Sequence, residues 1–298
     1  MRIAVALGGG GAKGFAHVGI LEALKNEGIK IDIITGTSMG ALVGAAYAAG
    51  KLERFRLEAE KIRLQDIPRL LSPSWSWSGM FSGQNVIELL SSFIGVEKIE
   101  DLPITYAAIA TNLTTGNAEA LVKGSLTQAI RASISVPALF TPVMIEGRAY
   151  IDGGASEPLP ISAARALGAD VVVGIDLFGN ALPCPPGNNP PGSSRPSPVQ
   201  SALSYLESLP EKFRPRLGNK DTTSRSSSGH VFEILEKTLV INQKHLTRLR
   251  LKEDPADILI SPAVANVSIL DFHRFRDVVR AGEDSGKITI QALRERGF

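Results

Sequence analysis

A serine enclosed by glycines is the residue best suited to chemistry in this chain. The pentapeptide Gly36-Thr37-Ser38-Met39-Gly40 fits the G-x-S-x-G pattern, which places a serine on a sharp strand-to-helix turn. The apolar run at 31–35 predicts a buried strand, and the small-residue run at 41–49 predicts a helix that Gly50 caps. Side chains at the two flanking glycines would collide as the helix doubles back past the strand. Ser38 is therefore a candidate nucleophile, with an ordinary helix N-cap as the alternative.

A glycine-rich loop precedes this unit. Arg2–Leu7 is expected to be a strand, and Gly8-Gly9-Gly10-Gly11-Ala12-Lys13-Gly14 follows it, before a helix that runs to Glu27. Backbone N–H groups of such a loop converge on an oxyanion, whether a pyrophosphate or a tetrahedral acyl intermediate. Gly9-x-Gly11-x-x-Gly14 also fits a dinucleotide fingerprint, with Asp32 about 20 residues on as the ribose-binding acid. The loop alone leaves nucleotide binding, oxyanion binding and a plain turn open.

Lys13 is the one charged side chain of this loop. It does not complete a phosphate-binding P-loop, because Gly14 follows it and the G-x4-G-K-[ST] spacing is missing. At the first turn of a helix we expect Lys13 to be a solvated or carboxylate-paired cation.

A serine nucleophile needs a partner that takes its proton. Asp152 lies at the expected end of a strand, and Gly153 and Gly154 after it allow a close backbone approach. Because a carboxylate with a pKa near 4 is a weak base, partial burial would have to raise that pKa. An ordinary Asp-Gly-Gly turn is the alternative interpretation. Asp176, at the end of the next expected strand, is the rival carboxylate.

The four histidines have no catalytic motif around them. His17 falls among apolar positions of the first expected helix, as core histidines do. His230 borders a polar loop, His245 lies on the basic half of an expected helix, and His273 lies at the start of another. We expect all three to be structural or solvated. A hydrolase with a late triad histidine stays open, and it would require His245 or His273 for activity.

Composition limits the class of protein. A chain of 298 residues, 44% hydrophobic and 21% charged, can bury one large α/β core. Its net charge of +2 is too small to indicate nucleic-acid binding. The single cysteine, Cys184, excludes an internal disulfide framework and a Cys-based zinc site. No apolar run approaches the roughly 20 residues of a membrane span and no signal peptide is evident, so we expect a cytoplasmic protein.

The remaining pattern predicts strands that alternate with helices, beginning with a β-α-β-α unit and a parallel strand pair. The expected helices lie at 52–63, 85–94, 126–133, 161–167, 231–251, 271–281 and 289–296. The expected strands lie at 104–110, 118–122, 143–146, 148–151, 171–175 and 258–260. The helix at 231–251 should bury one face, formed by Val231, Leu235, Leu239, Leu246 and Leu249.

Three motifs, taken in order, resemble one known family. GGGGAKGFAHVGIL, GTSMG and DGG look like the signature blocks of the patatin-like phospholipase family. The similarity continues through RASISVPALFTPV to QKHLTRLRL, ILISP and LDFHRF, and is closest to compact bacterial members related to the neuropathy-target-esterase group. It covers Met1–Asp176 well and Val231–Gly282 moderately. Ser133 and Pro137 fall in a segment that lies near the site in the family, although a helix stop explains them equally well.

The resemblance implies a three-layer α/β/α sandwich with a mostly parallel central sheet. It implies a catalytic core at 1–178, and 230–298 packing on the same core. The Pro/Gly/Ser-rich stretch at 179–229 is expected to be a partly disordered loop with a short helix near Val199–Leu209. The apolar stretch Trp75–Phe81 is expected to be either a lid that contacts membranes or a buried cluster.

The resemblance also implies a serine acyl hydrolase that cleaves lipid esters, either phospholipids or lysophospholipids, without metal or cofactor. On that model Ser38 attacks the ester, Asp152 accepts its proton and later activates water, and the amides around Gly9, Gly10 and Gly11 hold the oxyanion. Lys13, Gly14, Gly36, Gly40, Gly153 and Gly154 would support the motifs. Lys13 stands where the family often carries Arg. A lysine lacks the planar, bidentate geometry of the arginine guanidinium group. The expected partner is a lipid ester, with peripheral contact at the inner membrane surface and no nucleic acid.

Two other functions stay open besides the triad hydrolase. A Rossmann-type dinucleotide binder would use the glycine loop and Asp32 but leave Ser38 and Asp152 idle. A non-catalytic relative would keep the motifs without activity.

Overall fold

The computed structural model describes residues 1–66, 79–179 and 227–298. Its strands are β1 Ile3–Leu7, β2 Ile33–Thr37, β3 Gly79–Phe81, β4 Thr105–Asn112, β5 Ala118–Leu121, β6 Ala138–Phe140, β7 Val143–Ile145, β8 Arg148–Asp152, β9 Val171–Ile175 and β10 Ile258–Ile260. Its α-helices are α1 Ala16–Asn26, α2 Met39–Ala48, α3 Leu52–Glu60, α5 Gln84–Ile94, α6 Leu126–Ser133, α7 Ile161–Ala166, α9 Ser227–Glu253 and α10 Phe275–Arg294. Short 3-10 turns are η1 Gly11–Phe15, η2 Leu64–Asp66, η3 Ile99–Asp101, η4 Gly153–Ala155 and η6 Phe272–Arg274.

One mixed sheet organises the molecule. In the described residues its strand order is β10-β9-β1-β2-β4-β8-β7, and β5 pairs with β4 outside this path. The pairs from β10 to β4 are parallel, whereas β5, β8 and β7 are joined by antiparallel pairs. The C-terminal ends of β1 and β2 therefore meet at one edge of the sheet, where loops of an α/β protein form its site.

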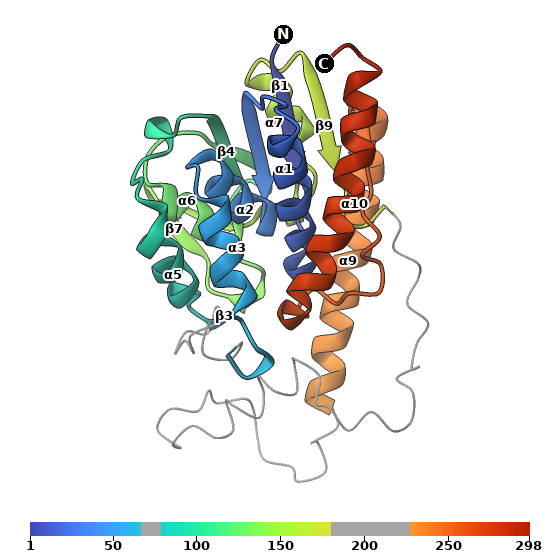
Figure 1. The fold of residues 1–298 in the computed structure, drawn as a ribbon. Coiled ribbons are helices and arrows are strands. Elements are labelled where there is room, and N and C mark those ends of the chain that lie inside the picture. The colour runs from blue at the N-terminus through green and yellow to red at the C-terminus, as the bar shows by residue number, and fades with distance from the viewer. Residues whose placement is uncertain (67–78, 180–226) are drawn as a thin grey trace, which may run out of the picture.

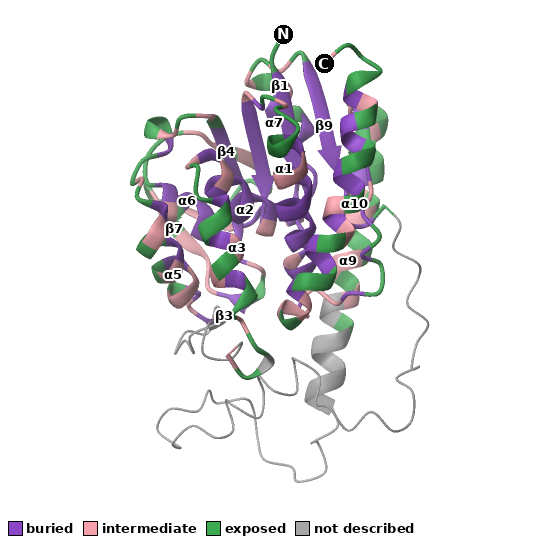
Figure 2. Ribbon diagram, viewed as in Figure 1, coloured by how far each residue is buried: buried purple, intermediate pink, exposed green. Residues whose placement is uncertain are grey.

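Helices cover both faces of the sheet, so the expected three-layer α/β/α architecture is confirmed (Figure 1). Alternate residues of β1 point to opposite faces: Val5 and Leu7 pack with α1, α2, α3 and α10, whereas Ala4 and Ala6 pack with α7. The central strands are purple along their whole length in Figure 2, which shows that they are buried from both sides. Such strands are continuous apolar runs rather than alternating ones.

Most expected elements are confirmed within a few residues, including α6, the β7–β8 hairpin, β9 and β10. The hairpin turns at Glu146 and Gly147, which have φ values of 48° and 76°. Two successive positive φ values define the tight turn that fits the twist of two antiparallel strands. This turn sets the register of β8, the strand that ends in Asp152.

The C-terminal helix corrects the sequence prediction. Helices at 271–281 and 289–296 were expected, but α10 runs without a break from Phe275 to Arg294. Its glycines allow close packing against α1: a Cβ at Gly282 would lie 2.1 Å from the carbonyl oxygen of Ala16, and one at Gly286 would lie 2.6 Å from Ala23 Cβ. Glycine here serves a helix contact distant in sequence, which local patterns do not reveal.

Other differences concern short or outlying segments. The three-residue strands β3 and β6 form a separate parallel pair that the sequence prediction lacked. Helix α9 is longer than expected, and Leu249 is exposed rather than buried. The expected short helix near Val199–Leu209, residues 180–226 of the 179–229 stretch and most of the 75–81 stretch lie outside the described residues. Residues 227–229 were expected to belong to the loop, but they form the first turn of α9. Among the described helices, none is long and apolar enough to cross a membrane.

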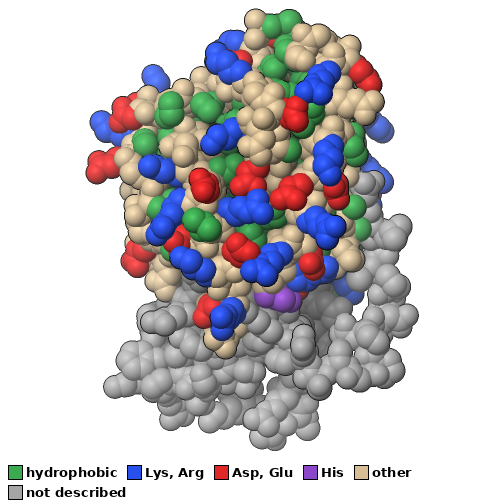
Figure 3. All heavy atoms as spheres, viewed as in Figure 1, with side chains coloured by type: hydrophobic (Ala, Val, Ile, Leu, Met, Phe, Trp, Pro, Cys, Tyr) green, Lys and Arg blue, Asp and Glu red, His purple; other side chains and the backbone are tan. Residues whose placement is uncertain are grey.

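Charges of both signs alternate on the face over α1, α3 and α10 (Figure 3). Ion pairs link these helices across that face, for example Arg276 of α10 with Glu60 of α3 and Arg294 of α10 with Glu27 beyond α1. Figure 3 shows no field of a single sign there, in keeping with the small net charge.

Candidate active site

Ser38 is the single residue between β2 and α2, and its backbone is strained. Its φ and ψ angles are 56° and −122°, a region that residues with side chains rarely adopt and that marks functional turns. Both flanking glycines are required by space: a Cβ at Gly36 would lie 2.4 Å from the carbonyl oxygen of Gly40, and a Cβ at Gly40 would lie 2.2 Å from that of Leu7. The expected steric basis of the turn is confirmed.

Asp152 is fixed on three sides at the end of β8. Its backbone N–H donates to the carbonyl of Ser135 at 2.9 Å, and its own carbonyl accepts from the hydroxyl of Thr111 at 2.9 Å. The carboxylate oxygen Oδ1 accepts from the Gly154 amide at 2.7 Å. Oδ2 is buried and has no hydrogen-bond partner among the described residues. One oxygen is thus anchored, and the other keeps its lone pairs.

Burial gives the Asp152 carboxyl the properties of a base. Only 3% of the residue is exposed, and desolvation raises the pKa of Asp152 from 3.8 to about 6. The Ser38 hydroxyl and the Gly154 amide act in the opposite direction by stabilising the carboxylate. The Ser38 hydroxyl therefore lies beside the Asp152 carboxylate. A pKa near 6 leaves the group ionised at neutral pH yet far more basic than a solvated aspartate.

The glycines after Asp152 allow two close contacts. A Cβ at Gly153 would lie 2.3 Å from the carbonyl oxygen of Ile109 in β4. A Cβ at Gly154 would lie 2.3 Å from Nε2 of Gln243 in α9. The close backbone approach expected of this sequence is therefore present, and one of its partners comes from a helix far along the chain.

The glycine loop lies beside Ser38. A Cβ at Gly9 would be 3.4 Å from Ser38 Cβ, but the Gly9 amide already donates to the carbonyl of Pro158 at 2.9 Å. Gly10 and Gly11 line the same cavity as Ser38, and their amides donate to no acceptor in the described part of the chain. They are the two loop amides available to an oxyanion.

Hydrogen bonds from His17 and Lys13 hold the glycine loop in place. His17 is completely buried, and its Nε2–H donates to the Gly8 carbonyl at 2.8 Å. Desolvation lowers its pKa to about 4, so it is neutral at physiological pH. Lys13 is only 4% exposed and donates to the carbonyl of Val264 at 2.7 Å, so the expectation of a solvated cation is wrong. Its ammonium group ties the loop to the chain beyond β10.

An apolar cavity of about 160 Å³ opens beside these groups. Aliphatic and aromatic side chains form nearly all of its wall, which also includes Ser38, Gly10 and Gly11. The lining comes from η1, α2, α3, α5, the segment from Ile134 to Phe140, α9 and η6. Helix α9 contributes Leu239, Val240 and Gln243. An elongated apolar group is the natural occupant of such a space.

The rival residues lie elsewhere. Asp176 uses Oδ1 to accept from the Phe178 amide at 2.9 Å and does not line the cavity. His245 and His273 are exposed and also lie outside it. Asp32 precedes β2 and bonds the amide of Ile3, so it sits at the opposite end of the strand from the glycine loop. A ribose-binding acid would follow β2, so the dinucleotide alternative has no support.

Sequence reasoning missed the contribution of α9 and underrated that of Ser133. The Ser133 hydroxyl accepts a hydrogen bond from the Ser38 amide at 2.9 Å, which only the three-dimensional structure reveals. No sequence pattern around Gln243 predicted a place in the site, because its position against Gly154 depends on how α9 packs on the rest of the fold. No cluster of His, Cys, Asp or Glu in the described residues could hold a metal ion.

Several known proteins are similar to this chain over more than half of its length. The family model for patatin-like phospholipases matches residues 5–165. An uncharacterized NTE family protein of Mycobacterium tuberculosis is 32% identical over 98% of this chain and 92% of its own length. Lysophospholipase NTE1 of Saccharomyces cerevisiae is 27% identical over 98% of this chain, which spans 16% of that protein. Among solved structures, VipD from Legionella pneumophila matches 69% of this chain and 52% of its own, with 16% identity and a TM-score of 0.38. The family model and the mycobacterial relative establish that the chain belongs to the patatin-like phospholipase family.

Proposed function

We propose that this protein is a serine acyl hydrolase in which Ser38 and Asp152 act as a dyad on lipid esters. The observation that carries the proposal is the buried carboxylate of Asp152, whose Oδ2 has no hydrogen-bond partner in the described part of the chain, beside a serine that lines an apolar cavity. The family supports lipid hydrolysis in general. The relatives named lysophospholipases favour a monoacyl phospholipid as the substrate.

The geometry fits a two-step acyl transfer. Ser38 Oγ attacks the ester carbonyl as Asp152 takes its proton, and the Gly10 and Gly11 amides bind the resulting oxyanion. When the intermediate collapses, the leaving alcohol receives that proton from Asp152 and an acyl-serine remains. Water then attacks the acyl-serine, giving its proton to Asp152, and the free acid leaves as Ser38 recovers its hydrogen. The acyl chain occupies the cavity throughout.

Covalent labelling tests this proposal. A fluorophosphonate probe should modify Ser38, and Ser38→Ala should abolish both labelling and the release of fatty acid from a lysophospholipid. Thr37→Ser is the matched control, because it removes a methyl group from the neighbouring residue and keeps the hydroxyl that donates to the Glu157 carbonyl outside the cavity lining. Full hydrolysis by Ser38→Ala would refute the proposal.

We further propose that the exposed side of α9 meets the lipid surface. Ile234 and Ile241 are 62% and 57% exposed, seven residues apart on the helix that also supplies Leu239 and Val240 to the cavity. Flotation with phosphatidylcholine vesicles should recover the wild type and lose Ile241→Glu. Equal recovery of both would contradict this contact.

A further inference from the structure

The hydroxyl of Ser133 connects the proposed nucleophile to the sheet. Ser133 ends α6, is completely buried and does not line the cavity. Its single hydroxyl hydrogen is donated to the carbonyl of Ile109 in β4 at 2.6 Å, while its oxygen accepts from the Ser38 amide at 2.9 Å. One side-chain oxygen therefore satisfies two buried backbone groups.

Ser38 depends on such support because of its backbone conformation. Strained φ/ψ values persist only where the surroundings fix them. The carbonyl of Ser38 is held by the amides of Ala41 and Leu42 in the first turn of α2. Its amide has the Ser133 hydroxyl as its acceptor, so this bond fixes the other side of the elbow.

The same short segment holds the proposed base. The carbonyl of Ser135 accepts from the Asp152 amide at 2.9 Å. Arg131 braces the segment: it donates to the hydroxyl of Ser135 at 2.6 Å and to the carbonyls of Ser82 and Thr141 at 2.6 and 3.0 Å. Residues 131–135 thus contact both members of the dyad and the two short strands near the cavity.

We propose that Ser133 is a positioning residue that aims Ser38 Oγ at Asp152 Oδ2. This inference rests on the proposed Ser38–Asp152 chemistry. Without the Ser133 hydroxyl, the Ser38 amide loses its acceptor and the Ile109 carbonyl loses one donor, and the elbow relaxes away from its strained geometry. Because Ser133 does not touch the cavity, the acylation rate should fall while substrate binding stays the same.

The test compares Ser133→Ala with Ser285→Ala, both assayed below their unfolding temperatures. Ser285 is a matched control, since it is a buried helical serine whose hydroxyl bonds a backbone carbonyl in α10, far from the cavity. Fluorophosphonate labelling of Ser38 should be about 10- to 100-fold slower in Ser133→Ala, the usual cost of a displaced reacting group. On a lysophospholipid, kcat should fall with KM unchanged, and Ser285→Ala should match the wild type.

A second variant guards against misfolding. Ser133→Cys replaces the hydroxyl, a strong donor and acceptor, with a somewhat larger thiol that is a weak donor and acceptor, so it should also slow labelling. Wild-type labelling rates in folded Ser133→Ala or Ser133→Cys would overturn the inference, as would an equal loss in Ser285→Ala. If instead the wild type is not labelled at Ser38, the proposed function fails, which is a distinguishable result.

Discussion

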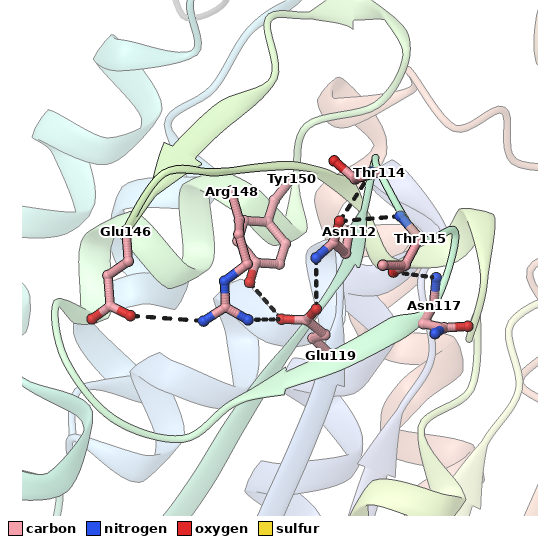
Figure 4. A network of polar contacts seen from close by, with 8 residues as sticks. All are labelled: Asn112, Thr114, Thr115, Asn117, Glu119, Glu146, Arg148 and Tyr150. Carbon is pink, nitrogen blue, oxygen red and sulfur yellow. Dashed lines mark hydrogen bonds and ion pairs between the residues drawn. The ribbon is translucent and has the colours of Figure 1, made fainter.

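Two carboxylates lie on either side of the same residue in β4 and differ in nearly every physical respect. Ala110 pairs with Asp152 of β8 on one edge and with Glu119 of β5 on the other. Glu119 accepts from the Tyr150 hydroxyl at 2.5 Å and from the Asn112 amide at 2.7 Å, and pairs with Arg148 at 3.3 Å (Figure 4). Asp152 has a single backbone donor and the neighbouring serine.

The comparison shows that surroundings decide what a carboxylate can do. Hydrogen bonds, with the one from Tyr150 foremost, hold the pKa of Glu119 below its ordinary value, whereas desolvation raises that of Asp152. Three donors, from Asn112, Arg148 and Tyr150, surround the Glu119 carboxylate and link β5 to β4 and β8. Asp152 is buried, and its Oδ2 has no hydrogen-bond partner among the described residues. Burial lowers the stability of the fold when the carboxylate is charged, and it makes the carboxylate a stronger base.

Exchange of each carboxylate for its amide should separate these roles most strongly. We expect Asp152→Asn to lower kcat/KM on a lysophospholipid by about 10²- to 10⁴-fold, the usual contribution of a general base. Glu119→Gln should stay within about threefold of the wild type, because Glu119 does not line the cavity. Equal losses in the two variants would contradict the division of roles.

The pH profile sharpens the assignment of the base. Since Asp152 must be ionised to accept the serine proton, kcat/KM should be constant above about pH 7 and decline below an apparent pKa near 6. The decline should approach about tenfold per pH unit. The rate is measured with a neutral ester and compared with thermal unfolding at each pH. A profile that stays flat down to pH 5 would exclude Asp152 as the base.

Stability should respond with opposite sign at the two sites. Because the folded-state pKa of Asp152 is raised from 3.8 to about 6, its charge disfavours folding above pH 6, by about 3 kcal/mol at 1.36 kcal/mol per unit. Asp152→Asn should therefore raise the free energy of unfolding at pH 8, and this gain should vanish below about pH 4. Glu119 has a lowered pKa, so Glu119→Gln should reduce stability at pH 8. Urea unfolding at both pH values measures these changes.

The smallest expected effect comes from the Tyr150 hydroxyl. Tyr150→Phe removes one hydrogen bond to Glu119 and should cost about 1 kcal/mol of unfolding free energy. The labelling rate of Ser38 should not change, although Tyr150 is only two residues from Asp152. A slower rate would mean that the Glu119 cluster also aligns β8 for catalysis, which would weaken the contrast between the two carboxylates.

The sequence predicted those features that depend on local geometry. Close backbone contacts occur at Gly36, Gly40 and Gly153, and the glycines of the two motifs predict them because no side chain would fit there. The burial of Lys13, the continuity of α10 through Gly282 and the position of Gln243 depend on contacts between distant segments. Ser133 could be placed at a helix end, but its two hydrogen bonds could not be foreseen from its neighbours.

The position of α9 also affects the order in which the protein becomes competent during synthesis. The glycine loop, Ser38 and Asp152 all lie within the first 152 residues to leave the ribosome, and the family match ends at residue 165. One wall of the cavity, formed by Leu239, Val240 and Gln243, is synthesised only after both of these residues. Under the proposed function, a chain that stops before α9 therefore carries Ser38 and Asp152 without this wall of the cavity for the acyl chain.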